Sequence, residues 1–323
     1  NIDIDKILYE FSHDKEGENS ATYPKNVGVE LDFLFDKITK GEIINKKVSG
    51  RIMYKYPGLY LDPIYLETMN GVISSRLALI DLHQPVHQLN INSTYSNVNV
   101  QNLFRSFNNF GQDFLTHQNI AGNISGESEF LTAINSDFTI KTSEIVSRNS
   151  FIIENGELNN FQPMIELSDF LKIDKMDHIQ FSNISNTVLI NENQITIPEM
   201  DIKSSAINLQ ASGTHSFDKT FKYHLATKLS DILFNKANSA HRQEFNIALD
   251  KEDKRTIFLV LYDKGDGMVV EFDEDQAIKK IRNDLKEEKN VLKVVLNEEF
   301  GLYKDDELVK ENLEKTNCKV GCE

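Results

Sequence analysis

The sequence predicts a mainly β protein built on one long, curved antiparallel sheet, open like a trough or half-barrel, with a few amphipathic helices. Runs in which apolar and polar residues alternate follow one another through most of the chain, most clearly over 178–229. Alternation places every second side chain on the same face of a strand, so each run has one apolar and one polar face.

Short connections between these runs are the second observation behind this fold. Asn191-Glu192-Asn193 and Asp218-Lys219 leave room only for turns, which forces neighbouring strands to run antiparallel. A Ser-Gly pair also recurs inside the alternating runs, and a glycine within a strand marks a bulge or a tight bend. We therefore expect the sheet to bend at Ser49-Gly50, Ser125-Gly126 and Ser212-Gly213.

The N-terminal region predicts a helix over 1–11, with Asp3 as its cap, followed by a polar loop. Strands are then expected at 24–38, 43–55, 58–68, 72–82 and 86–96. Turns at Tyr56-Pro57-Gly58 and Asn70-Gly71 separate them, and Asn-Gly is a strong two-residue hairpin signal.

The segment 97–107 matches 1–11 in residue type at most informative positions, which predicts an internal repeat of a strand end followed by a helix. This second helix carries a stripe of large apolar residues. We expect the stripe to plug the sheet; insertion into a membrane is the alternative. The stripe consists of Leu103, Phe104, Phe107, Phe110 and Phe114.

Strands resume at 123–138 and 139–154, and Pro163 is expected to open a short helix. Beyond the central meander, further strands are predicted at 244–249, 256–262 and 268–272, with Asp266-Gly267 turning the last pair.

The residues after 272 change character. Segment 273–303 keeps apolar residues at helical spacing, begins with acidic residues and ends near Gly301, so it predicts one long amphipathic helix. The predicted organisation is thus a curved β-sheet domain over 1–272, a helix over 273–303 and a charged tail over 304–323.

Composition narrows the function classes. The chain has 323 residues and a net charge of −15, which argues against nucleic-acid binding and against steady docking on anionic membranes. No apolar run long enough for a transmembrane helix is present, and the chain begins at Asn1. We expect a fragment or a processed product, which could have lost an N-terminal anchor.

No motif for catalysis is found, so the protein is predicted not to be an enzyme and to need no cofactor or metal. His83 and His87, with Asp81 beside them, would share one face of a strand, and a surface or rim position is favoured over metal binding. Cys318 and Cys322 could open a zinc site or close a small loop; a disordered tail or a local disulfide is favoured.

What remains is an apolar face that is too long to leave exposed to water. Burying an acyl chain stabilises a complex by about 0.8 kcal/mol per CH₂, so a lipid tail is a suitable cover. The residues predicted to line this lipid groove are Val27, Val29, Leu31, Phe33, Phe35, Ile195, Ile197, Ile207, Leu209, Phe221, Tyr223 and Leu225.

The order of elements in 178–229 also resembles a known family. An apolar strand, an Asn-rich turn, an Ile-x-Ile-Pro strand, Ile-x-Ser-Ser and a strand ending in Ala-Ser-Gly are similar to the C-terminal region of AsmA-like envelope proteins, relatives of the bridge-like lipid-transfer proteins. Segment 102–127 looks like the helix-then-strand unit of that family, and 285–306 resembles the closing helix of members from Bacteroidota-type bacteria.

This resemblance implies a periplasmic protein with a transmembrane anchor, in the inner membrane or alternatively the outer one. It also implies phospholipid movement between the two membranes and a role in outer-membrane biogenesis, without catalytic residues. The alternative is an envelope scaffold or assembly factor that binds a protein partner and fills the sheet with its own helices. A β-solenoid adhesin is disfavoured by the uneven strand lengths.

Overall fold

The computed structural model describes residues 2–3, 23–232, 256–263 and 267–277. Contacts between residues divide the chain into two units, Asn1–Glu271 and Phe272–Glu323. The described part of the second unit ends at residue 277 and contains a helical stretch over 274–277. The predicted helix 273–303 therefore lies almost wholly outside the described residues, and the predicted boundaries at 272 and 303 stay predictions.

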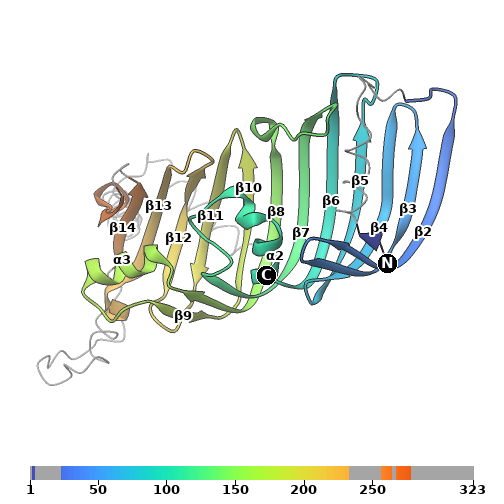
Figure 1. Ribbon diagram of the computed structural model, residues 1–323. Coiled ribbons are helices and arrows are strands. Elements are labelled where there is room, and N and C mark those ends of the chain that lie inside the picture. Colours follow the sequence, from blue (N-terminus) through green and yellow to red (C-terminus); the bar gives the residue numbers. More distant parts are fainter. Residues whose placement is uncertain (1, 4–22, 233–255, 264–266, 278–323) are drawn as a thin grey trace, which may run out of the picture. The chain divides into compact units, whose positions relative to one another are not determined.

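The first unit is built on a single open sheet, which confirms the predicted fold class. Strands account for 62% of the structure, and the sheet does not close into a barrel. Its strands follow one another nearly in chain order (Figure 1), and every pair from β2 to β14 is antiparallel, whereas β1 pairs parallel with β2. Strand β9 lies off this path and pairs with β8.

The strands are long in the first half of the sheet and shorter in the second. They are β1 (Ile2–Asp3), β2 (Gly28–Lys40), β3 (Ile43–Lys55), β4 (Gly58–Thr68), β5 (Gly71–Ile80), β6 (Val86–Asn99), β7 (Ile120–Asn135), β8 (Val146–Asn159), β9 (His178–Phe181), β10 (Ile184–Asn191), β11 (Gln194–Ile202), β12 (Leu209–Ser216), β13 (Phe221–Lys228), β14 (Thr256–Asp263) and β15 (Met268–Phe272).

Strands β3 and β4 have the predicted bounds, and most others agree within a few residues. The strand predicted at 139–154 begins only at Val146. Before it, Thr139 bonds the carboxylate of Asp137, and a short 3-10 helix η2 (Thr142–Glu144) follows. The strand predicted at 244–249 and the turn residue Asp266 lie outside the described residues.

The hairpin between β4 and β5 corrects one predicted turn. Thr68 pairs with Gly71, so Met69 and Asn70 form the turn, with positive φ angles of 50° and 64°. Gly71 instead begins β5, where a side chain would collide with the backbone of Ser96 and Val98. The glycine is thus required for close strand approach rather than for the turn.

Irregular strand pairing occurs at all three predicted Ser-Gly sites. Each glycine lies beside a register shift between strands, and each is paired across the sheet with an aromatic residue. A ring over a strand glycine covers the backbone that the missing side chain leaves bare. The pairs are Gly50 with Phe33, Gly126 with Tyr95, and Gly213 with Tyr223.

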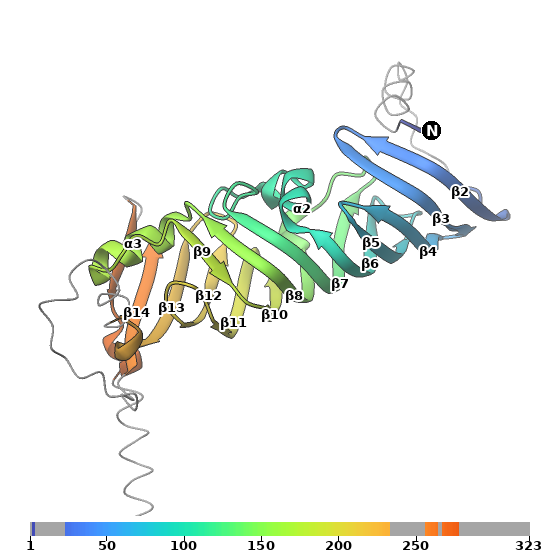
Figure 2. The same ribbon diagram turned by 90° about the horizontal axis from the view of Figure 1, so that it is seen from below.

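Two α-helices lie on one side of the sheet (Figure 2), which we call the inner face. Helix α2 (Val100–Ser106) begins after Asn99, whose side-chain oxygen accepts a hydrogen bond from the backbone N–H of Asn102 at 2.9 Å. Helix α3 (Gln162–Leu171) has Pro163 in its first turn, as predicted.

The helix predicted over 1–11 is not supported at its start, because Ile2–Asp3 form strand β1. The rest of that segment lies outside the described residues. In the matching segment 97–107, β6 extends to Asn99 and only Val100–Ser106 is α-helical.

The core consists of three clusters on the inner face. One joins α3 to β12–β14 through Leu167, Leu209 and Leu259. A second joins α2 to β7, β8 and β10, and a third lies at the other end of the strands around Leu79, Leu82 and Ile134. The helices therefore cover one margin of the inner face.

Candidate functional site

The inner face carries a row of side chains that runs without a break across eleven strands. Strand pairing places successive members directly opposite one another, so the row follows the long axis of the sheet. At ~4.8 Å per strand it spans about 50 Å. This long row consists of Leu31, Ile52, Leu61, Leu77, Ile91, Phe130, Ser147, Ile190, Ile195, His215 and Phe221.

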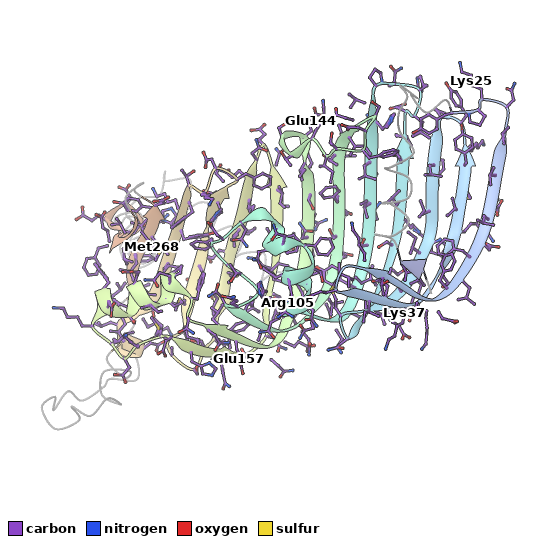
Figure 3. The ribbon with its side chains drawn as sticks, in the orientation of Figure 1. Lys25, Lys37, Arg105, Glu144, Glu157 and Met268 are labelled. Carbon is purple, nitrogen blue, oxygen red and sulfur yellow. The ribbon has the colours of Figure 1, made fainter. Side chains whose placement is uncertain are left out.

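The opposite, outer face is mainly polar along the same strands, although it also exposes Leu34, Leu131, Val146 and Leu189. In β6, for example, Asn90, Asn92 and Thr94 are exposed, whereas the alternating Ile91 and Ser93 are half-buried. Figure 3 shows Lys25 at one end of β2 and Lys37 near the other, so these charges lie toward the ends of the strand. No charged residue occurs in the long row. Along the long row the inner face is therefore mainly apolar, as predicted, whereas the outer face is only partly polar.

A second, polar row lies beside the long row on the inner face. Its members are directly paired across β5 to β8, and all are half-buried. The hydroxyls of Ser75 and Ser93 are 2.7 Å apart, and Ser128 donates to the amide oxygen of Asn149 at 2.7 Å. This polar row, Ser75, Ser93, Ser128 and Asn149, offers hydrogen bonds without charge.

Sequence reasoning missed the polar row. Its residues interrupt the apolar alternation of four separate strands, and each looks like an isolated exception. Only the registers of the β5–β6, β6–β7 and β7–β8 pairs show that they are adjacent. Those registers depend on turns and bulges between strands, which residue type alone does not fix.

The predicted groove residues of β2 differ in exposure along the strand. Val27 and Val29 are each 49% exposed and Leu31 is 55% exposed. Phe33 and Phe35 are half-buried and stacked, with ring centroids 5.5 Å apart. These residues face solvent or each other, and neither α2 nor α3 belongs to their surroundings.

Three of the other predicted groove residues lie beneath a helix. Ile207, Leu209 and Leu225 belong to the core cluster beneath α3. Ile207 precedes β12 rather than forming part of it. Ile195 and Ile197 are half-buried on β11.

Phe221 and Tyr223 are covered by the segment 107–119, which we call the strap. The ring of Phe114 lies 4.9 Å from Phe221 and 5.7 Å from Tyr223, measured between centroids. Asp113 forms an ion pair with Lys219 at 2.7 Å, in the turn between β12 and β13. The strap leaves α2, reaches across the inner face as far as β12 and β13, and returns to β7 (Figure 1).

His215 lies within the same aromatic group. Its ring centroid is 5.0 Å from that of Phe114, and its Nδ1 is 3.2 Å from the hydroxyl of Tyr223. Burial lowers the pKa of His215, against the opposing influence of Asp113 and Asp218. Burial likewise raises the pKa of Tyr223. Both groups are thus neutral at pH 7 and form part of an uncharged plug.

The predicted aromatic stripe of the second helix divides into two parts. Leu103 and Phe104, both within α2, pack against the second core cluster, as expected for a plug. Phe107 and Phe110 belong to the strap and are 53% and 56% exposed. Phe110 lies within the 3-10 helix η1 (Asn108–Gly111) and Phe107 directly precedes it, and their rings stack with centroids 5.6 Å apart. A single helical stripe was therefore the wrong prediction beyond Ser106.

The predicted pairing of His83 and His87 on one strand is wrong. His83 lies in the turn before β6 and is exposed, whereas His87 is 2% exposed and its Nδ1 lies 3.1 Å from the carbonyl oxygen of Asp81. Within the described residues, no group of three or more His, Cys, Asp or Glu side chains could hold a metal ion. Cys318 and Cys322 lie outside those residues.

Comparisons with known proteins found no match for this chain. No family model, no curated protein and no solved structure matches the chain. In the part of the chain that the structure describes, no helix is both long and apolar enough to cross a membrane.

Proposed function

We propose that this protein binds phospholipid by laying acyl chains along the inner face, and that it conducts lipid between the inner and outer membranes in support of outer-membrane biogenesis. The long row is the observation that carries the proposal. From β2 to β10 it offers about 35 Å of surface at ~4.8 Å per strand, apolar except at Ser147 of β8, before the strap covers it.

The energetics favour an acyl chain as the cover. A tail of roughly 16 carbons could gain up to ~12 kcal/mol if fully buried, from about 0.8 kcal/mol per CH₂. No member of the long row is charged, so this row offers no site for a phosphate. The polar row beside it suits the ester oxygens that join the tails to glycerol, while the headgroup stays in water.

The periplasmic location and the membrane anchor rest on the sequence resemblance to AsmA-like proteins. The fold is compatible with that resemblance, because an open sheet with one apolar face is what a lipid conduit needs. The periplasmic location and the anchor are therefore part of the proposal.

An envelope scaffold is the second candidate, and one observation favours it. At β11 to β14 the inner face is filled by the chain itself, through α3 and Phe114. A scaffold that binds a protein partner instead of lipid would be expected to fill its sheet with its own side chains in this way.

Native mass spectrometry of the protein, purified without detergent, distinguishes the two candidates. We expect bound phospholipid, and we expect Ile91→Asp to reduce it strongly by placing a carboxylate in the long row. Asn92→Asp is the matched control, one residue along β6 on the outer face, and should leave lipid binding unchanged. Lipid-free protein that carries a stoichiometric protein partner would favour the scaffold.

A charged side chain at a half-buried position could also impair folding, so the thermal unfolding of each variant is measured in parallel. Ile91→Gln provides a milder change at the same site. If both Ile91 variants stay folded and bind as much phospholipid as the unaltered protein, the long row does not hold the lipid.

A further inference from the structure

Within the part of the chain that the structure describes, strand β2 forms an edge of the sheet over most of its length. Its described partner on the far side from β3 is the two-residue strand β1, which pairs only with Ile38 and Thr39. Among the described residues, none pairs with that edge from Gly28 to Lys37. An edge strand presents unpaired backbone N–H and C=O groups and can accept a further strand.

Apart from its exposed carboxylates, the edge lacks the usual protection against such pairing. Between Gly28 and Asp36 it contains neither lysine nor proline, and Leu34 is 75% exposed. Protected edges are short or carry Lys, Pro or a bulge. The strand at the other end of the order, β15, has 5 residues, whereas β2 has 13.

Charge indicates what kind of strand would fit. The outer face of β2 carries three carboxylates, Glu30, Asp32 and Asp36, and all three are exposed. Arg51 of β3 pairs with Glu30 at 2.9 Å and with Asp32 at 2.7 Å, so one guanidinium serves two of the carboxylates. The edge therefore remains acidic.

A second copy of the chain fits this edge poorly. Pairing β2 with another β2, with the apolar faces aligned, would place the carboxylates of both copies on one face. Like charges directly opposite one another destabilise a strand pair. A strand with lysine or arginine at these positions would instead meet each carboxylate with an opposite charge.

We propose that the β2 edge is a docking site for an extended partner segment in which apolar residues alternate with lysine or arginine. The apolar residues continue the inner face beyond Val29, Leu31 and Phe33, and the basic residues pair with the outer carboxylates. Main-chain hydrogen bonds supply affinity and the alternation supplies specificity, as in other cases of strand addition.

The test uses the full chain and a labelled peptide of about nine residues with alternating Lys and Val, long enough to span Gly28–Asp36. A block isomer with the same composition controls for simple attraction to a negatively charged protein. We expect the alternating peptide to bind at least about tenfold more tightly than the block isomer, because only it can pair as a two-faced strand. Hydrogen exchange should slow at amides 28–36 and stay unchanged in β13.

Leu34→Lys places a positive charge on the edge at an exposed position and should weaken the alternating peptide by about tenfold through repulsion. Leu131→Lys is the matched control, since Leu131 is 44% exposed on the outer face of the interior strand β7, and should leave binding unchanged. Equal binding of the two peptides would overturn the proposal. So would a dimer of the unaltered protein that Leu34→Lys dissolves, because the edge would then serve a second copy.

Discussion

Gly126 shows how a single residue shapes the inner face. It lies between Tyr95 of β6 and Phe151 of β8, and an added Cβ would meet the backbone of Ser150 and Phe151 and the hydroxyl of Tyr95. Backbone cannot move aside as the end of a flexible side chain can. The repeated Ser-Gly pairs made these bends predictable, but the aromatic partners became visible only with the registers.

We expect Gly126→Val to lower the free energy of unfolding by about 2–3 kcal/mol, because the strands around β7 must separate to admit the side chain. Urea denaturation measures this change. Gly28→Ala is the control, since its Cβ would meet only the backbone oxygen of Tyr54 at 3.9 Å, and should change the free energy of unfolding by less than about 0.5 kcal/mol. Equal effects of the two variants would show that the close approach of backbone at Gly126 does not constrain the sheet.

We expect His215 to make the free energy of unfolding depend on pH. Its folded-state pKa lies below the ordinary value of 6.5, so between these two values the unfolded chain binds a proton that the folded protein does not. The free energy of unfolding should therefore fall as pH drops below about 6.5 and stop falling below the folded-state pKa.

Denaturation at a series of pH values checks this expectation, and His215→Gln should flatten the pH dependence in that window. His83→Gln should retain it, because His83 lies exposed in a turn. If both variants titrate as the unaltered protein does, another group is responsible.

At the scale of elements, alternation was enough to predict the strands, and it failed where the chain leaves the sheet. The strap is the clearest case. Its residues Phe107, Phe110 and Phe114 keep helical spacing, yet positive φ angles at Asn108, Asn109 and Phe110 end the helix, and Phe114 packs on β13. These contacts are made between segments about a hundred residues apart, which local periodicity does not report.

We expect the ring of Phe114 to hold the strap on the sheet, rather than the ion pair between Asp113 and Lys219. Phe114 contacts Phe161, His215, Phe221 and Tyr223, so Phe114→Ala should cost on the order of 2 kcal/mol in the free energy of unfolding. Lys219→Ala breaks an exposed ion pair and should cost at most about 0.5 kcal/mol.

Chemical denaturation ranks the two strap variants, and hydrogen exchange at residues 107–119 reports whether the strap itself has loosened. The opposite ranking, with Lys219→Ala the more damaging, would show that charge holds the strap in place.

At the scale of the whole first unit, the open antiparallel sheet and its single apolar face could be predicted because strand periodicity repeats throughout the chain. The site could be predicted only in part. The residues of β2 and β11 share the inner face as expected, but Ile207, Leu209 and Leu225 lie under α3, because the position of a helix over a sheet depends on packing between distant segments. The polar row was not foreseen for the same reason.

Photo-crosslinking at two adjacent positions of β5 tests the central claim most directly. Leu77 belongs to the long row, and its neighbour Ala78 faces the outer side. With a photoreactive residue at either position and phospholipid vesicles present, we predict lipid adducts at position 77 and none at 78. Adducts at neither position, or at both equally, would contradict the claim that the inner face is the surface that holds lipid.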